Sequence, residues 1–287
     1  MGLARNGQKR QGEPLTSAGH RMRDAYTGMN RLYLSMHTPA EVAGEDINDP
    51  VMSDWLAQNL RSGARILDAG CGLGFDALAL HRGLPARPSG KSWTVYASDF
   101  SADMLADAAR AGAAHGVPAS RYRQVSFAGL AELPDWRQSM DAVTVNYAIY
   151  TQPEPSTDYD SYLQESIQGL AAVMRPGGAM LLNFRDWPAL RADHLGGADH
   201  VVENTHDGVR FHCRYSWSFG PRRVHMGTLL MREADGPVRR TEVWFAERSP
   251  ADIARTLRAA RLVPHCIKRH GVGASSFFTL VALKDPT

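Results

Sequence analysis

The sequence predicts an α/β protein with a mostly parallel sheet, helices on both faces and a second, antiparallel sheet. Short apolar runs alternate with helical stretches between residues 61 and 184, which is typical of a parallel sheet. The first run ends in a glycine cluster that opens a helix. Three β-rich runs without intervening helices follow, and they predict the antiparallel sheet.

Composition limits the function classes. The chain has 287 residues, enough for one large domain that carries an insertion. Its 32 Lys and Arg residues balance 30 Asp and Glu residues, and no basic stripe gathers. A nucleic-acid partner would require such a stripe. The sequence therefore favours a small neutral or zwitterionic substrate and no nucleic acid.

The chain carries no targeting or membrane signal that we recognise. Residues 1–20 are polar, and we expect them to be flexible rather than a signal peptide. No stretch approaches the roughly 18 apolar residues of a membrane span. The three cysteines are widely spaced and suit reduced thiols. We expect a cytoplasmic protein without a membrane partner, and a homo-oligomer stays open.

Residues 21–60 are expected to form a helical cap. Apolar and aromatic side chains recur at spacings of three and four from Arg21 to Met36, which predicts an amphipathic helix. A second helix is predicted over Asp49 to Leu60, with Pro50 near its start.

The predicted core, residues 61–184, alternates strands and helices. Its expected strands are Arg65–Ala69, Trp93–Ala97, Arg123–Phe127, Asp141–Asn146 and Ala179–Asn183, and its helices are Phe75–His81, Ala102–Ala114 and Tyr162–Met174.

Residues 185–248 are expected to form an antiparallel β insertion over the mouth of the active site. Its predicted strands are Val209–Phe219, Arg223–Arg232 and Val238–Glu247. Residues 249–287 then complete the core with a helix over Ala251–Arg261 and strands at Val263–Lys268 and Phe277–Leu283.

The segment from Arg191 to Cys213 is polar and is expected to be a loop. It carries four regularly spaced histidines: His194, His200, His206 and His212. Their six-residue spacing matches no paired metal-ligand motif, so no metal site is predicted.

The strongest signal is Asp68-x-Gly70-x-Gly72-x-Gly74 between a strand and a helix. Glycines at such a turn let the backbone approach a ligand closely. A nicotinamide site would need glycine at position 75, where Phe75 stands, so the turn favours S-adenosylmethionine (SAM). Asp99 ends the next strand and is placed to bind ribose hydroxyls.

Four segments in order resemble the motifs of class I SAM-dependent methyltransferases, which have a Rossmann-like fold. They are Ile66–Gly74, Ala97–Leu105, Asp141–Val143 and Met174–Gly178. The resemblance implies a seven-stranded sheet with a reversed final hairpin. The resemblance and the residue types together predict the following cofactor contacts: Asp68, Gly70, Cys71, Gly72, Gly74, Asp99, Phe100, Met104, Ser126, Phe127 and Asn146.

Within that family the chain looks most like the glycine and sarcosine N-methyltransferase group, because Asn183–Trp187 leads into a β-rich cover. The resemblance implies that Arg185 binds the substrate carboxylate; the alternative is a structural salt bridge, for instance to Asp186 or Asp193. The group has an asparagine where Ala148 stands here, so the acceptor amine stays open.

Several tyrosines are expected on the acceptor side. Tyr147 and Tyr150 follow the fourth strand, at the sheet edge where ligands bind. With Tyr26 and Tyr33 they are predicted to form an aromatic box for a cation, although ordinary core packing would give the same spacing. The acceptor-side candidates are Tyr147, Tyr150, Arg185, Tyr26, Tyr33 and Asn146.

The predicted function is methyl transfer from SAM to a small molecule, with the amine of an amino acid or related metabolite as acceptor. One alternative keeps SAM but cyclises it to azetidine-2-carboxylate and methylthioadenosine. A nucleic-acid methyltransferase is disfavoured by the missing basic patch. A non-catalytic SAM-binding protein is disfavoured by the intact glycine turn with Asp99.

Overall fold

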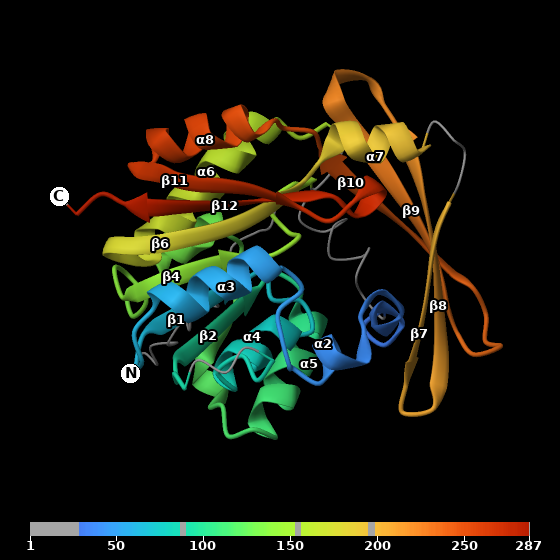
Figure 1. Ribbon diagram of the computed structural model, residues 1–287, viewed down its shortest axis with the longest axis horizontal. Helices are drawn as coiled ribbons and strands as arrows, with labels where there is room; N and C mark the ends of the chain where they lie inside the picture. The colour runs from blue at the N-terminus through green and yellow to red at the C-terminus, as the bar shows by residue number, and fades with distance from the viewer. Residues whose placement is uncertain (1–28, 87–89, 153–155, 195–198, 287) are drawn as a thin grey trace, which may run out of the picture.

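The computed structural model describes residues 29–86, 90–152, 156–194 and 199–286, which form two sheets with helices around them (Figure 1). The main sheet has seven strands in the order β11-β12-β6-β4-β1-β2-β3. Strand β12 runs antiparallel to both β6 and β11, whereas β6, β4, β1, β2 and β3 pair in parallel. The expected α/β fold, with its reversed final hairpin, is confirmed.

The elements of the main sheet agree closely with the prediction. Its strands are β1 (Arg65–Ala69), β2 (Thr94–Asp99), β3 (Tyr122–Gln124), β4 (Met140–Val145), β6 (Met174–Arg185), β11 (Leu262–His270) and β12 (Phe277–Lys284). The helices around it are α2 (Pro39–Val42), α3 (Pro50–Asn59), α4 (Phe75–His81), α5 (Ala102–Ala113), α6 (Tyr159–Val173) and α8 (Pro250–Ala259). Strand β6 begins five residues earlier than expected, because Met174 already pairs with Met140 of β4.

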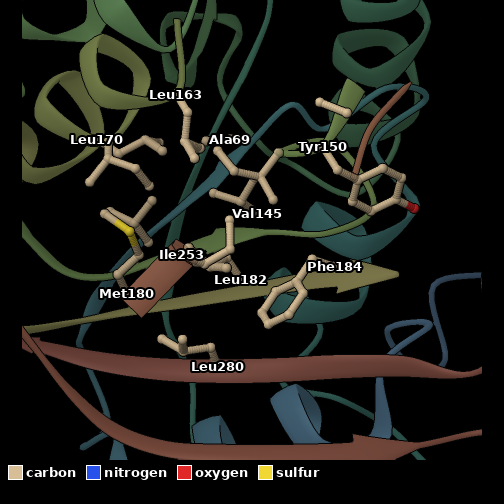
Figure 2. Packing of buried hydrophobic residues seen from close by; sticks show 14 of the residues in the cluster. Ala69, Val145, Tyr150, Leu163, Leu170, Met180, Leu182, Phe184, Ile253 and Leu280 are labelled. Carbon is tan, nitrogen blue, oxygen red and sulfur yellow. The ribbon is translucent and has the colours of Figure 1, made fainter. Parts of the chain in front are cut away.

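Both faces of the main sheet are buried, which explains why its strands are continuously apolar. On one face, Leu163 and Leu170 of α6 and Ile253 of α8 pack with Met180 and Leu182 of β6 (Figure 2). The neighbouring β6 residue Leu181 points to the other face, where α3 and α4 pack. Burial of one such side chain contributes roughly 1.5–3 kcal/mol.

The second sheet lies beside the carboxyl edge of the main sheet (Figure 1), and we call it the cover sheet. It is antiparallel in the order β5-β10-β9-β8-β7. Its strands are β5 (Thr151–Gln152), β7 (His200–His206), β8 (Val209–Phe219), β9 (Val224–Glu233) and β10 (Arg239–Ala246). Strand β5 comes from outside residues 185–248, so the core and the expected insertion share this sheet.

The segment expected as a loop is instead structured. It contains the end of α7 (Trp187–His194) and the whole of β7, and it overlaps the start of β8, where a strand was predicted. Strand β7 is an edge strand exposed along most of its length, so it lacks the alternating apolar residues that signal a strand. His206 binds the backbone oxygens of Leu34 and His37, at 2.8 and 3.0 Å, and so ties β7 to the N-terminal segment.

The prediction of a long helix over Arg21–Met36 is wrong in the part that the structure describes. Residues 21–28 lie outside the described residues, and the rest forms a short 3-10 helix, η1 (Leu32–Met36). Contacts with β7, β8 and β9 hold η1 in place, including a 2.8 Å bond from the Asn204 amide to the Ser35 oxygen. Tertiary packing therefore overrides the helical spacing.

No helix among the described residues is long and apolar enough to cross a membrane.

Candidate active site

A cavity of about 860 Å³ lies where the carboxyl edge of the main sheet meets the cover sheet. Ligands bind at this edge in open α/β sheets. The glycine turn and the ends of β2 and β4 supply one half of the wall, and η1 and the cover sheet supply much of the other. We call these the cofactor half and the acceptor half.

The glycine turn explains how the backbone reaches the cavity. Gly70 and Gly72 line it with φ angles of 73° and 52°, a region that side chains disfavour. A Cβ on Gly70 would lie 2.9 Å from the Ala148 Cβ and 3.1 Å from the Phe127 ring. Gly74 was expected to contact the cofactor, but it is not among the described residues that line the cavity. It starts α4 and packs on Ala108 of α5.

Asp68 places a buried carboxylate in the cavity wall. Its Oδ1 accepts a 3.2 Å hydrogen bond from Thr144, whereas its Oδ2 has no partner among the described residues. Burial raises the pKa of Asp68 well above its usual value, and the charges of Asp76 and Asp99 raise it further. An unpaired acceptor among carboxylates favours a cationic group on the ligand.

Asp76 is a site residue that the sequence reading missed. It lies in the first turn of α4, lines the cavity and accepts a 2.7 Å hydrogen bond from the Asn146 amide. Burial raises the pKa of its carboxyl group. Its position two residues after the glycine turn was the available signal.

Asp99 connects the glycine turn to the start of α5. Its Oδ2 accepts the Gly72 N–H at 2.9 Å, and its Oδ1 accepts the Ser101 N–H at 2.8 Å. Burial raises the pKa of this carboxyl group too. Each oxygen keeps a further acceptor position, which suits the two hydroxyls of a ribose.

Five other expected cofactor residues line the cavity: Cys71, Phe100, Met104, Ser126 and Phe127. Burial raises the pKa of the Cys71 thiol well above its usual value, which disfavours the thiolate form that a nucleophile needs. The Ser126 hydroxyl accepts the Gly129 N–H at 3.2 Å and orders the loop that carries Phe127.

Tyr147 is held in an unusual backbone conformation at the end of β4, with φ of 55°. Its N–H donates to Asn183 Oδ1 at 2.6 Å, and its hydroxyl donates to the Asn48 oxygen at 2.5 Å. Asn183 also donates to the Oδ1 of Asn146. Burial raises the Tyr147 pKa well above its usual value, so the hydroxyl stays neutral. A non-glycine residue in this region marks a functional constraint more often than chance.

The structure brings three of the four expected tyrosines to the cavity. Tyr33, Tyr147 and Tyr150 line its wall, whereas Tyr26 lies outside the described residues. Tyr150 sits at the end of the packed core and directs its hydroxyl away from the aliphatic side chains (Figure 2). Asn146 also lines the cavity.

Arg185 lies among aromatic rings on the acceptor half. Its guanidinium carbon is 4.7 Å from the Phe277 ring centroid and 5.0 Å from that of Trp217. Its Nη1 donates to the Ala274 oxygen at 2.9 Å, while the buried Nε has no partner among the described residues.

The two acidic residues that were alternative partners of Arg185 are engaged elsewhere. Asp186 pairs with Arg269 at 2.5 Å, and Asp193 accepts the Ala274 N–H at 2.5 Å. Within the described part of the chain, Arg185 has no ion-pair partner. The salt-bridge alternative is therefore wrong for these residues.

The sequence reading also missed most of the acceptor half. An aromatic and aliphatic wall comes from the cover sheet: Tyr215, Leu229, Val243 and Phe245. His37, Asn48 and His270 add polar groups. No motif marks these positions, because distant segments bring them together.

Comparisons with known proteins identify similar sequences and folds. Residues 66–178 match a family model described as a methyltransferase domain. A SAM-dependent methyltransferase from Clostridium acetobutylicum is 14% identical with a TM-score of 0.60, over 90% of this chain and 96% of that one. The CcbJ methyltransferase from Streptomyces caelestis is 15% identical with a TM-score of 0.61, over 94% and 98%.

The sugar N-methyltransferase KedS8 from Streptoalloteichus is also similar in structure. It is 15% identical with a TM-score of 0.55, over 99% of this chain and 100% of that one. No curated protein sequence matches the chain. At such identities the structural likeness establishes the fold alone.

The cofactor half fits SAM. The orphan Oδ2 of Asp68 offers an acceptor for the ammonium group of the methionine moiety, and Asp99 offers two acceptors for the ribose. The glycine turn leaves backbone room where a side chain would collide with Phe127. Residues 66–178 therefore resemble a methyltransferase domain in sequence, and the cavity wall that they supply suits SAM.

Proposed function

We propose that the protein transfers the methyl group of SAM to the amine of a small molecule that carries a carboxylate, such as an amino acid or a related metabolite. The observation that carries this proposal is the environment of Arg185. It is a cavity-lining cation among aromatic rings, with a free buried donor and no carboxylate partner in the described chain.

Arg185 suits a substrate carboxylate better than a structural role. A guanidinium binds a carboxylate through two parallel hydrogen bonds, and its unpartnered Nε supplies one of these donors. The flanking rings of Phe277 and Trp217 keep water away, which strengthens the pairing. The bound carboxylate would orient the neighbouring amine within the cavity.

SAM supplies an activated methyl group on a sulfonium when it is bound. Asp68 and Asp76 would hold its ammonium end, and Asp99 would hold its ribose. The chain's contribution to the displacement is then to align the amine behind the methyl carbon and to exclude water. Such positioning provides most of the acceleration in reactions of this type.

The neutral tyrosines suit a reacting amine. Burial keeps Tyr147 and Tyr150 protonated, so both present hydroxyls and ring faces rather than charges. Ring faces stabilise the positive charge that passes from sulfur to nitrogen during transfer. Tyr33 adds a third ring from η1.

The acceptor is open to a direct test with labelled methyl groups. The protein would be incubated with methyl-labelled SAM and matched acceptor pairs, each amino acid beside its decarboxylated amine and an amino sugar. We expect label in amino acids and a drop of more than tenfold in kcat/KM for Arg185→Met, since a bidentate pair contributes more than about 1.4 kcal/mol.

Arg269→Met is the matched control, because Arg269 is a nearby arginine that pairs with Asp186. Its activity should stay near that of the wild type. Equal activity of Arg185→Met and wild type would rule out the carboxylate role. Label in amino sugars but in no amino acid would assign the acceptor to the class of the similar sugar N-methyltransferase.

A further inference from the structure

A histidine on the cavity wall has no part in the function described so far. His270 ends β11, and it lines the cavity together with Gly271 and Ser275 of the turn that follows. Its side chain is 13% exposed. Among the described residues, His270 pairs with the buried carboxylate of Asp49, the residue that caps the N-terminus of α3.

Asp49 is fully buried and well supplied with donors. It caps α3 by accepting the Met52 N–H at 2.9 Å, and it accepts the Thr279 hydroxyl at 2.5 Å and the Asn183 amide at 3.2 Å. His270 Nε2 lies 3.3 Å from its Oδ2. These hydrogen bonds, led by those of His270 and Thr279, outweigh burial and lower the pKa of Asp49. Asp49 is therefore ionised at neutral pH.

The hydrogen bonds of Thr279 determine which ring nitrogen of His270 carries the proton. The single hydroxyl proton of Thr279 is donated to Asp49. The oxygen of Thr279 can therefore only accept in its 2.9 Å contact with His270 Nε2. The proton of the neutral ring thus sits on Nε2, and Nδ1 carries the lone pair. The hydrogen bond and ion pair of His270 within the described chain both involve Nε2. Nδ1 is also not one of the buried polar atoms without a partner.

His270 lies close to the proposed carboxylate anchor. It pairs in register with Phe277, and the two rings stack at 6.2 Å. The Arg185 guanidinium is 4.7 Å from the same Phe277 ring, and Tyr147 meets that ring edge to face at 4.7 Å. A small molecule anchored at Arg185 would therefore lie within reach of the imidazole.

We propose that His270 is the general base that deprotonates the acceptor amine, with Asp49 and Thr279 as the positioning pair behind it. The proposal rests on the proposed function, since it takes the acceptor to be an amine. An alkylammonium group has no lone pair, and most amines are protonated at neutral pH.

The proton and electron balance is complete without another reactant. Nδ1 of His270 takes one proton from the ammonium group and becomes imidazolium. The freed nitrogen pair forms a bond to the methyl carbon, and the carbon–sulfur bond breaks with its pair remaining on sulfur. The positive charge passes from sulfur to nitrogen. The imidazolium then returns its proton to water, and Asp49 stabilises it meanwhile.

Charged groups lie on both sides of His270. The Asp49 carboxylate, 3.3 Å from Nε2, is placed to stabilise an imidazolium. Arg185 contacts the Phe277 ring on which His270 stacks, and a bound carboxylate would neutralise its charge. Thr279, the other group at hydrogen-bond distance, is neutral.

The first test needs no acceptor. Histidine ring signals of the full chain would be followed by NMR from pH 5 to 9 with S-adenosylhomocysteine, using His270→Gln for assignment and calorimetry to record binding of the nucleoside. We expect the Nε2–H tautomer in the wild type and a loss of that tautomer preference in Asp49→Asn, because Asp49 and Thr279 are the acceptors that fix the proton on Nε2. An Nδ1–H tautomer in the wild type would overturn the proposal.

The second test uses the acceptor found in the labelled-methyl assay. His270→Gln should lower kcat by about 100-fold at pH 7, with the KM for SAM unchanged, and the loss should shrink as the pH rises. His212→Gln, on the exposed face of β8, is the control. An unchanged pH-rate profile would overturn the base. Failure to bind S-adenosylhomocysteine would instead refute the proposed function.

Discussion

Replacement of Asp68 by asparagine should separate cofactor binding from stability. Asp68 is buried, its Oδ2 has no partner in the described chain, and burial and two neighbouring carboxylates raise its pKa. A charged hydrogen bond contributes about 1.5–3 kcal/mol, so loss of the carboxylate should weaken SAM binding by roughly 10- to 150-fold. Removal of an unpaired buried charge should leave the free protein as stable as before, or more stable.

The pH dependence has a definite sign. A carboxyl whose pKa is raised on folding adds stability below its usual pKa, and this contribution is lost as the pH rises through the folded value. Between the usual pKa of a carboxyl group and the raised pKa of folded Asp68, the free wild-type protein should therefore lose stability with rising pH more steeply than Asp68→Asn. SAM binding should release protons, because an ammonium group favours the ionised carboxylate.

Asp141 provides the matched control on the same sheet. It is also buried, but hydrogen bonds from the Arg65 N–H and the Arg175 guanidinium, at 2.8 and 2.7 Å, more than offset burial and lower its pKa. Its contribution is present above its usual pKa and is lost as the pH falls. Asp141→Asn should therefore destabilise the protein and leave SAM affinity unchanged.

Titration calorimetry with SAM and urea unfolding between pH 5 and 8 would measure both effects. Binding of SAM by Asp68→Asn within threefold of the wild-type affinity would contradict the role of Asp68 as a cofactor ligand.

Two further substitutions test the two halves of the cavity. Gly70→Ala should weaken SAM binding at least tenfold in calorimetry, because the new Cβ would press on Ala148 and Phe127 at a φ of 73°; unchanged affinity would contradict the role of the turn. Gly227→Ala should destabilise the protein by about 1–3 kcal/mol in urea, because its Cβ would lie 2.5 Å from the Tyr215 ring. Gly227→Ala should also raise the KM for the acceptor and leave the affinity for SAM unchanged. Equal weakening of acceptor and SAM binding would show that the two halves of the cavity are not separate.

Much of the main sheet was predictable because its signals are local. The run Ile66–Gly74 carries a buried strand, a glycine turn and a helix start within nine residues, and the structure has these elements there. The β-rich runs also predicted β8, β9 and β10 to within a residue or two.

The rest depends on contacts that the sequence does not mark. Strand β7 is polar and exposed, so its register comes from β8 rather than from its own residues. Asp49 and Thr279 are 230 positions apart, and no motif joins them to His270. Asp76 was overlooked because a helix-start aspartate is ordinary, and only the fold shows that it lies in the cavity wall beside Asn146.

The proposed transfer of a methyl group from SAM to a small molecule is tested most directly by the mass of the nucleoside product, after incubation with SAM alone and then with pooled amino acids and amines. We expect S-adenosylhomocysteine, formed only when an acceptor is present. Methylthioadenosine formed from SAM alone would contradict it and establish the cyclising reaction in its place.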